Sequence, residues 1–328
     1  MGTLKAGIIG CGAVTQKSYI SNLPRCGKIV ISYLFDTNIE MALKAAKGTD
    51  IEAVSLNELK KKSDIIIIAT PPSTHFELLK DVLVEGKMVI CEKPFLTNAI
   101  EVQEVLEIAK KYNSQLYVAH FRRCFPTLKL ANELISTNIL GEVKGISIFE
   151  GGKFSWHTES GYVFSDKSGG VLYDTGSHSI DMALYVTSLD LQTISKVHIN
   201  TITRDKVEPS HEIKAALKLE LESNKAVDFN FMLSRYGVLS NKIKIECENG
   251  YLEIPIDMKN YIKIGRNDKF TILYTKEKYE NLMDCFAIQF DEMLNDDIND
   301  KFKAYRFSNL VKILETVRDF ESNIESLS

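Results

Sequence analysis

The residues that follow the first apolar segment have the types and spacing of a dinucleotide-binding turn. Gly10–Gly12 come after the run Leu4–Ile9, which has the length and composition of a β-strand, and a helical pattern starts at about Ala13. In such a strand–turn–helix, the first glycine permits the tight turn, and the second lets a pyrophosphate approach the backbone at the helix N-terminus. The residues predicted to line this part of a cofactor site are Gly10, Gly12, Ala13 and Val14.

An acidic residue lies where such a fold binds the adenosine ribose. Asp36 follows the β-branched and aromatic run Ile29–Phe35, at the distance typical of a carboxylate that accepts hydrogen bonds from the ribose hydroxyls and repels a 2′-phosphate. Asp36 and the adjacent Thr37 are therefore predicted to contact the cofactor, with NAD favoured over NADP. Thr15 occupies the third glycine position, so a glycine turn in some other doubly wound fold is the alternative interpretation.

These turns need a scaffold of alternating strands and helices, and the chain shows that alternation up to about His120. Apolar runs such as Asp64–Ala69 and Met88–Cys91 are separated by amphipathic segments such as Thr74–Glu85. Strands that are apolar on both faces and separated by helices indicate a parallel sheet covered on both sides. The predicted fold class is α/β, with an N-terminal Rossmann domain, a doubly wound parallel sheet, over residues 1–123.

The pattern changes in the second half of the chain. Glu212–Leu221, Ala226–Leu233 and Lys242–Cys247 alternate between apolar and polar residues, which indicates an antiparallel sheet with one buried face. Residues 124–328 are predicted to form an α+β domain with a large, open, mostly antiparallel sheet, which serves substrate binding and oligomerisation. We expect the exposed face of such a sheet to pair with a second copy, giving a homodimer or homotetramer.

The composition excludes several other classes of protein. Of the 328 residues, 45% are apolar and 26% charged, as in ordinary globular chains, and the net charge of -4 argues against a nucleic-acid-binding surface. The longest apolar run, Ile65–Ala69, is far shorter than the ~20 residues of a membrane span. The N-terminus lacks a signal-peptide pattern, and the six cysteines have no paired spacing. We therefore expect a cytoplasmic protein that binds neither nucleic acid nor membrane.

Four further segments follow one another in the order found in a known family. Together they resemble the glucose-fructose oxidoreductase / inositol dehydrogenase (Gfo/Idh/MocA) family of NAD(P)-dependent oxidoreductases. The resemblance implies hydride transfer between nicotinamide and a secondary alcohol or ketone of a sugar, nucleotide sugar or cyclitol. The segments that carry it are Ala69–His75, Glu92–Pro94, His120–Pro126 and Gly169–Asp181.

The same resemblance implies which side chains make up the site. For the cofactor it adds Thr70, Pro71, Pro72, His75, Glu92, Lys93 and Arg123. For the substrate it implies Lys93, Arg122, Trp156, Asp174 and His178.

The implied reaction can be compared with the residues that would perform it. Removing a hydride from an alcohol carbon leaves an alkoxide unless the hydroxyl proton departs, so a base of near-neutral pKa must lie within reach of that oxygen. His178 fits this requirement, and Asp174, four residues earlier, shares its helical face. Lys93 supplies a cation for the oxyanion. Lys93, Asp174 and His178 are therefore predicted to be catalytic, with Lys93 as the alternative proton acceptor.

Each of these residues also has an alternative interpretation as a purely structural residue. Asp174 has the residue type of a helix N-cap, His178 that of a satisfied core histidine, and Lys93 that of a solvated loop lysine. Asp174, His178 and Asp181 have spacing for a metal on one helical face, but no third nitrogen or sulfur ligand lies nearby, so we expect no metal. A nucleotide-sensing regulator or binding protein without turnover is the alternative function.

Overall fold

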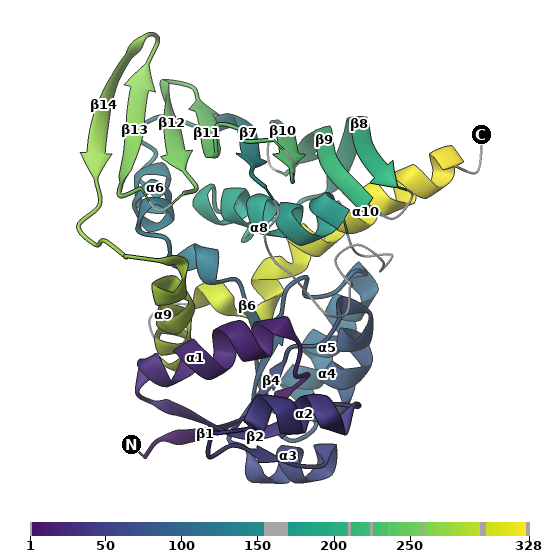
Figure 1. Ribbon diagram of the computed structural model, residues 1–328. Helices are drawn as coiled ribbons and strands as arrows, with labels where there is room; N and C mark the ends of the chain where they lie inside the picture. The colour runs from purple at the N-terminus through teal and green to yellow at the C-terminus, as the bar shows by residue number, and fades with distance from the viewer. Residues whose placement is uncertain are drawn as a thin grey trace. The chain divides into compact units, whose positions relative to one another are not determined.

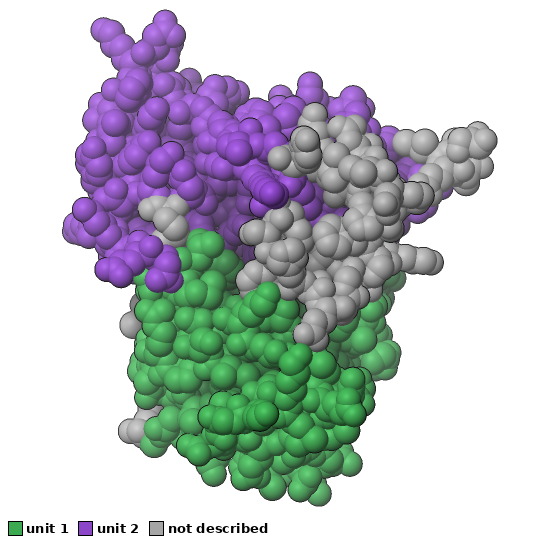
Figure 2. All heavy atoms as spheres, viewed as in Figure 1, with its two compact units in different colours: residues 1–121, 157–162, 282–311 green, residues 122–156, 163–281, 312–328 purple. Residues whose placement is uncertain are grey.

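The protein's structure, a computed structural model, describes residues 2–153, 170–208, 211–223, 226–235, 237–257, 259–295 and 300–325. The chain divides into two compact units, which Figure 2 shows in green and purple. Unit 1 runs to Phe121 and also contains Leu282–Val311, whereas unit 2 begins at Arg122, continues to Asn281 and resumes at Lys312. Each unit is described by itself below.

Unit 1 is built on a six-stranded parallel sheet with the strand order β3-β2-β1-β4-β5-β6. The central strand β4 consists of four isoleucines, all of them buried, which is the composition expected of a strand covered on both faces. The predicted Rossmann sheet is thereby confirmed. Its strands are β1 (Leu4–Ile9), β2 (Ile29–Phe35), β3 (Glu52–Ala53), β4 (Ile65–Ile68), β5 (Met88–Glu92) and β6 (Gln115–Ala119).

Three helices of unit 1, α2, α3 and α5, begin at side-chain caps. The Ser55 side chain and Glu58 form a reciprocal capping box at the start of α3, and the Asn98 side chain accepts hydrogen bonds from the first turn of α5. The strand order reverses between β1 and β4, so the loops at the carboxyl ends of these strands border the crevice where such folds bind ligands. The helices are α2 (Ile39–Ala46), α3 (Leu56–Lys62), α4 (His75–Leu83) and α5 (Ala99–Lys111).

The segment Leu282–Val311 belongs to unit 1, although we expected the second domain to hold residues 124–328 without interruption. Its helix α9 (Leu282–Leu294) packs beside the irregular helical stretch that follows the glycine turn. The ring of Tyr19 lies 5.0 Å from that of Phe286 and 5.8 Å from that of Phe290. This aromatic cluster is apolar surface that the Rossmann elements leave open, and burying it favours the association.

Unit 2 is built on an eight-stranded sheet with the order β14-β13-β12-β11-β7-β10-β9-β8. Of its seven neighbouring pairs, six are antiparallel and one, β7 with β10, is parallel. The prediction of a large, mostly antiparallel sheet is confirmed. Its strands are β7 (Val143–Gly151), β8 (Lys196–Glu208), β9 (His211–Glu222), β10 (Ala226–Ser234), β11 (Lys242–Cys247), β12 (Gly250–Pro255), β13 (Tyr261–Arg266) and β14 (Lys269–Tyr274).

Two helices, α6 (Pro126–Ser136) and α8 (Gly170–Val186), lie against one face of this sheet (Figure 1). Alternate residues of β10 are buried on the face toward them, namely Val227, Phe229, Phe231 and Leu233. The chain closes with α10 (Ser308–Glu325), the longest described helix. Within the described residues, no helix is long and apolar enough to cross a membrane.

A buried cluster of charges ties the start of unit 2 to α8. The Arg123 side chain is 0% exposed, and its guanidinium forms two-pronged contacts with Asp181 on α8, 2.5 Å from Nη2 to Oδ1 and 2.9 Å from Nε to Oδ2. Its Nη1 lies 3.1 Å from Oδ2 of Asp190, which follows the same helix. Since all three side chains are buried, the cluster holds only while its charges remain paired.

We expect Arg123→Met to lower the free energy of unfolding by about 3–5 kcal/mol, because Asp181 and Asp190 would be left as buried, uncompensated carboxylates. Urea unfolding followed by circular dichroism measures the change. Arg318, 38% exposed and 4.0 Å from its partner Asp319, is the matched control, and Arg318→Met should cost little. A loss of less than about 1 kcal/mol in Arg123→Met would contradict this account of the cluster.

Candidate active site

The glycine turn after β1 has the geometry that the sequence predicted. Gly10 has φ +97°, and a Cβ built there would lie 2.6 Å from the carbonyl oxygen of Ala69, so no larger residue fits. Thr15, which replaces the usual third glycine, is buried and donates a hydrogen bond from Oγ1 to the Gly10 carbonyl at 2.6 Å. The departure from the fingerprint therefore strengthens the turn. The residues Ala13 and Val14 are the first helical residues after it.

Gly12 differs from Gly10, because the protein's own packing does not require a glycine there. A Cβ added to Gly12 would meet no atom within 4 Å among the described residues. The open space above this residue is what a pyrophosphate would need in order to reach the backbone at the helix N-terminus. The turn thus offers a cradle for a phosphate group.

Asp36 joins the end of β2 to the same turn. Its Oδ2 accepts a hydrogen bond from the Cys11 amide at 2.8 Å, and its Oδ1 accepts one from the Asn38 amide at 2.9 Å. Among the residues that the structure describes, no lysine or arginine forms an ion pair with Asp36. The carboxylate is half-buried and the neighbouring Thr37 is exposed. Asp36 is therefore positioned beside the turn with its negative charge uncompensated.

The loop after β4 is linked to the loop after β5 through a histidine. Thr70, Pro71 and Pro72 lead into α4, whose first residue, His75, is fully buried. The two ring nitrogens of His75 each lie 2.9 Å from a carbonyl oxygen, that of Phe95 and that of Thr70. Burial lowers the pKa of His75, which favours the neutral ring. In this position the side chain connects the two loops.

Glu92 connects the backbone of Lys93 with Tyr19 through hydrogen bonds. Its side chain is buried, accepting a hydrogen bond from the Tyr19 hydroxyl at 2.8 Å and another from the Lys93 amide at 3.1 Å. Burial raises the pKa of the Glu92 carboxyl, partly offset by the hydrogen bond from Tyr19 and the nearby Lys93. The Lys93–Pro94 peptide bond is cis. The backbone that carries Lys93 is therefore anchored, and its side chain is half-buried.

In unit 2, Asp174 and His178 lie one turn apart on α8. His178 is 7% exposed, and the Asp174 side chain is 22% exposed. Oδ2 of Asp174 lies 2.7 Å from Nη2 of Arg235, a residue that directly follows β10. The expectation that these two residues share a helix is met, and the charge partner of Asp174 is new.

Sequence reasoning missed Arg235, although a signal was present. The apolar residues Val227, Phe229, Phe231 and Leu233 occupy every second position of β10, and residue 235 continues this inward series. A charged residue on the buried register of a strand needs a partner inside. That argument would have singled out Arg235 without the structure.

A second polar link holds α8 one residue beyond His178. Oε2 of Glu150, at the end of β7, accepts a hydrogen bond from the Ser179 hydroxyl at 2.5 Å. The other oxygen of Glu150 lies 2.8 Å from Nη1 of Arg122. Because β7 and β10 are parallel and Glu150 is in register with Leu233, Glu150 and Arg235 emerge at the same end of the sheet. Arg122, which we predicted to bind substrate, thus forms an ion pair with Glu150 within unit 2.

Arg123 and Trp156 are two further residues that the sequence analysis assigned to the site. Arg123, predicted to contact the cofactor, has its guanidinium fully enclosed by Asp181 and Asp190, which favours a structural role. Trp156, predicted to line the substrate pocket, lies outside the described residues. Lys93 belongs to unit 1, whereas Asp174 and His178 belong to unit 2.

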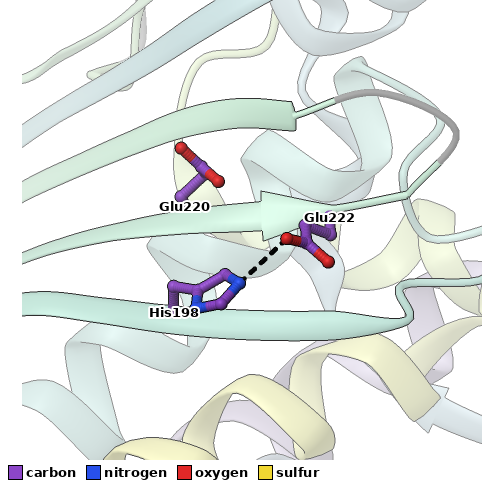
Figure 3. A group of neighbouring side chains, drawn as sticks. All are labelled: His198, Glu220 and Glu222. Atoms are coloured by element: carbon purple, nitrogen blue, oxygen red, sulfur yellow. Dashed lines mark hydrogen bonds and ion pairs between the residues drawn. The ribbon is translucent and has the colours of Figure 1, made fainter.

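The described residues contain one group of side chains with metal-ligand chemistry, on the sheet of unit 2 (Figure 3). His198 on β8 and Glu220 and Glu222 on β9 have ligand atoms within 4.8 Å of one another. Nε2 of His198 lies 2.9 Å from Oε1 of Glu222, with 36% and 43% of the two side chains exposed. An ordinary surface ion pair accounts for this contact. The group alternates with buried Leu219 and Leu221, so it faces away from α8.

Comparison with known families agrees with the fold and the turn. A family model described as "Oxidoreductase family, NAD-binding Rossmann fold" matches residues 4–120, and one for the GFO/IDH/MocA C-terminal domain matches residues 128–253. The chain therefore belongs to the Gfo/Idh/MocA family of oxidoreductases. Residues 4–120 form its NAD-binding Rossmann domain.

Individual relatives match most of the chain at low identity. Glucose-6-phosphate 3-dehydrogenase of Bacillus subtilis (strain 168) is 25% identical over 313 residues, covering 90% of this chain and 83% of the relative. Inositol 2-dehydrogenase of Rhizobium meliloti (strain 1021) is 22% identical over 298 residues, covering 87% and 88%. The crystal structure of an aldose-aldose oxidoreductase from Caulobacter crescentus, complexed with glycerol, shares the fold with a TM-score of 0.78 at 17% identity over 96% of each chain.

The open space at Gly12 leads to a prediction about NAD binding. In Gly12→Ala the added methyl group would meet no atom of the described residues within 4 Å, but it would fill space that the fold leaves for a pyrophosphate. We expect the Kd for NADH, measured by its fluorescence, to rise at least ~10-fold (about 1.4 kcal/mol) with an unchanged Tm.

Gly152→Ala is the control, because a Cβ at Gly152 in unit 2 also meets no atom of the described residues within 4 Å. Gly152→Ala should change neither the Kd for NADH nor the Tm. Unaltered NADH affinity in Gly12→Ala would mean that the pyrophosphate does not pass over this residue.

Proposed function

We propose that the protein is an NAD-dependent oxidoreductase that transfers a hydride between the nicotinamide and a secondary alcohol or ketone of a sugar, nucleotide sugar or cyclitol. One observation of the site carries this proposal. A nearly buried histidine lies on α8 one turn from a carboxylate that an arginine holds in place. Titratable groups held in this way in a largely buried helix are typical of a site for proton transfer. The named relatives, which include sugar and inositol dehydrogenases, support the substrate class.

His178 is proposed as the proton acceptor in alcohol oxidation. Bound NAD supplies the hydride acceptor at its nicotinamide. As the C–H bond breaks, the hydroxyl proton moves to the neutral imidazole, so that no free alkoxide has to form. Asp174 is proposed to orient the substrate hydroxyl or the imidazolium that develops. In the reductive direction the same groups return the proton to the ketone oxygen.

Lys93 is proposed to stabilise the negative charge that develops on the substrate oxygen. Glu92 supports this role, because its hydrogen bond with the Lys93 amide fixes the backbone from which the ammonium group extends. The alternative assignment, Lys93 as the proton acceptor, remains an outcome that the variants below decide. A nucleotide-sensing regulator without turnover is not favoured, since the matched relatives are named as dehydrogenases.

The cofactor contacts are proposed for the turn and loops at the carboxyl ends of the strands of unit 1. They involve Gly10, Gly12, Ala13, Val14, Asp36, Thr37, Thr70, Pro71, Pro72 and Lys93. We propose supporting roles for Glu92 and His75, whose side chains bind neighbouring protein groups, and a structural role for Arg123.

The assembly and location of the protein are further parts of the proposal. The edge strand β14 exposes Phe270 and Tyr274, at 53% and 67%, which supports pairing of this sheet with a second copy in a homodimer or homotetramer. All six cysteines are free thiols, which supports a reducing, cytoplasmic location.

Cofactor preference follows from the charge beside the turn. Because no cation offsets Asp36 among the described residues, NAD should bind at least ~10-fold more tightly than NADP, as measured by isothermal titration calorimetry. Asp36→Ala should narrow this ratio. It should also weaken NAD binding, since the Cys11 and Asn38 amides lose their acceptor. Equal affinity of the unmodified protein for NAD and NADP would overturn the assignment of Asp36.

The proton acceptor can be tested by substituting His178 and, as a control, His198, both of which belong to unit 2. His178→Ala should lower kcat for alcohol oxidation by about 10²–10⁴-fold while leaving the Kd for NADH unchanged. Activity would be followed as NADH absorbance with cyclitols, sugar phosphates and nucleotide sugars, beginning with myo-inositol and glucose 6-phosphate. His198→Ala, which alters the surface ion pair on β8, is the control and should retain full activity. If His178→Ala keeps kcat and Lys93→Ala does not, Lys93 is the proton acceptor.

A further inference from the structure

Arg235 occupies a position where a charged side chain is costly. It lies on the inward register that follows β10, and its side chain is only 5% exposed. Taking a guanidinium out of water costs several kcal/mol unless an ionised partner and hydrogen-bond acceptors replace the solvent. The structure provides both, since Nη2 of Arg235 lies 2.7 Å from Oδ2 of Asp174 and 3.2 Å from the carbonyl oxygen of Gly170.

These two contacts fall on successive turns at the start of α8. Gly170 is the first residue of the helix and Asp174 lies four residues later, one turn before His178. Arg235 therefore fixes both the first turn of the helix and the direction of the Asp174 carboxylate. The two side chains differ in exposure, because Asp174 retains 22% of its surface and Arg235 only 5%. Arg235 thus supports the carboxylate from the buried side and leaves part of it open.

We propose that Arg235 is a positioning residue for the hydride-transfer reaction, which acts through Asp174 by holding its carboxylate in one orientation for its part in the reaction. This inference rests on the proposed function, in which Asp174 takes part in catalysis. Without the guanidinium, the Asp174 carboxylate loses the 2.7 Å contact that fixes its direction. Misplacing a catalytic group by about 1 Å can cost ~10²-fold in rate.

A double-mutant cycle tests the inference with the full-length protein. The variants are Arg235→Met, Asp174→Asn and the double variant, with kcat and KM measured for whichever of myo-inositol, glucose 6-phosphate and UDP-N-acetylglucosamine gives the highest turnover with NAD. We expect Arg235→Met to lower kcat by about 10–100-fold. The Kd for NADH should stay within about twofold, because its contacts are proposed for unit 1. In the Asp174→Asn background, Arg235→Met should change kcat by less than about threefold.

A conservative variant separates positioning from folding. Arg235→Lys keeps the charge but not the planar guanidinium whose Nη2 contacts both Asp174 and Gly170, so it should fold and regain part of the kcat that Arg235→Met loses. If Arg235→Met does not fold, the cycle is completed with Arg235→Lys, whose smaller loss should again vanish in the Asp174→Asn background.

The outcomes distinguish this inference from the proposed function. Losses that multiply in the double variant, or a kcat in Arg235→Met within about threefold of the unmodified protein, would overturn the role of Arg235 alone. An Asp174→Asn variant with full kcat would overturn the catalytic role of Asp174, and with it this inference. The absence of turnover with all three compounds would count against the proposed substrate class and the inference that depends on it.

Discussion

The burial of α8 is the constraint on which unit 2 depends. Fifteen of its seventeen residues are buried, yet the helix carries Asp174, His178 and Asp181. Each charge placed inside must be paired, because desolvation costs more than packing returns. Arg235 at the end of β10 pairs with Asp174, and Arg123 at the start of the unit pairs with Asp181. Glu150 at the end of β7 adds a hydrogen bond from the Ser179 hydroxyl. The ion pairs of Asp174 and Asp181 therefore also determine how α8 packs against the rest of unit 2.

In unit 1, buried or half-buried polar side chains connect the loops at the ends of the strands. Its strands are apolar on both faces, so polar groups gather where the strands end. There, single side chains connect neighbouring loops, with Asp36 bonding the glycine turn, His75 bridging the loops after β4 and β5, and Glu92 fixing the base of Lys93. These links pre-order the loops that must meet a nucleotide. Gly12 is the exception, since no atom of the described residues lies within 4 Å of the place that a Cβ would take there.

The sequence alone allowed two interpretations of Asp174, and neither includes the contact that the structure shows. An aspartate near a helix start has the residue type of an N-cap, and the same residue four positions before a histidine suggests a catalytic pair. Its carboxylate instead bonds Arg235, sixty-one residues later in the chain. The 2.7 Å contact with Nη2 of Arg235 holds the Asp174 carboxylate in one orientation.

Local signals in the sequence were sufficient to determine both sheets, the glycine turn and the presence of Asp174 and His178 on one helix. Periodicity, turn residues and short motifs depend only on neighbours in the chain. The parallel pairing of β7 with β10, the association of α9 with unit 1, and the partners of Asp174, Arg122 and Arg123 were decided by the tertiary structure. The physical reason is that a buried charge accepts any partner of opposite sign within reach, and which one comes within reach depends on how strands distant in sequence are ordered in the sheet.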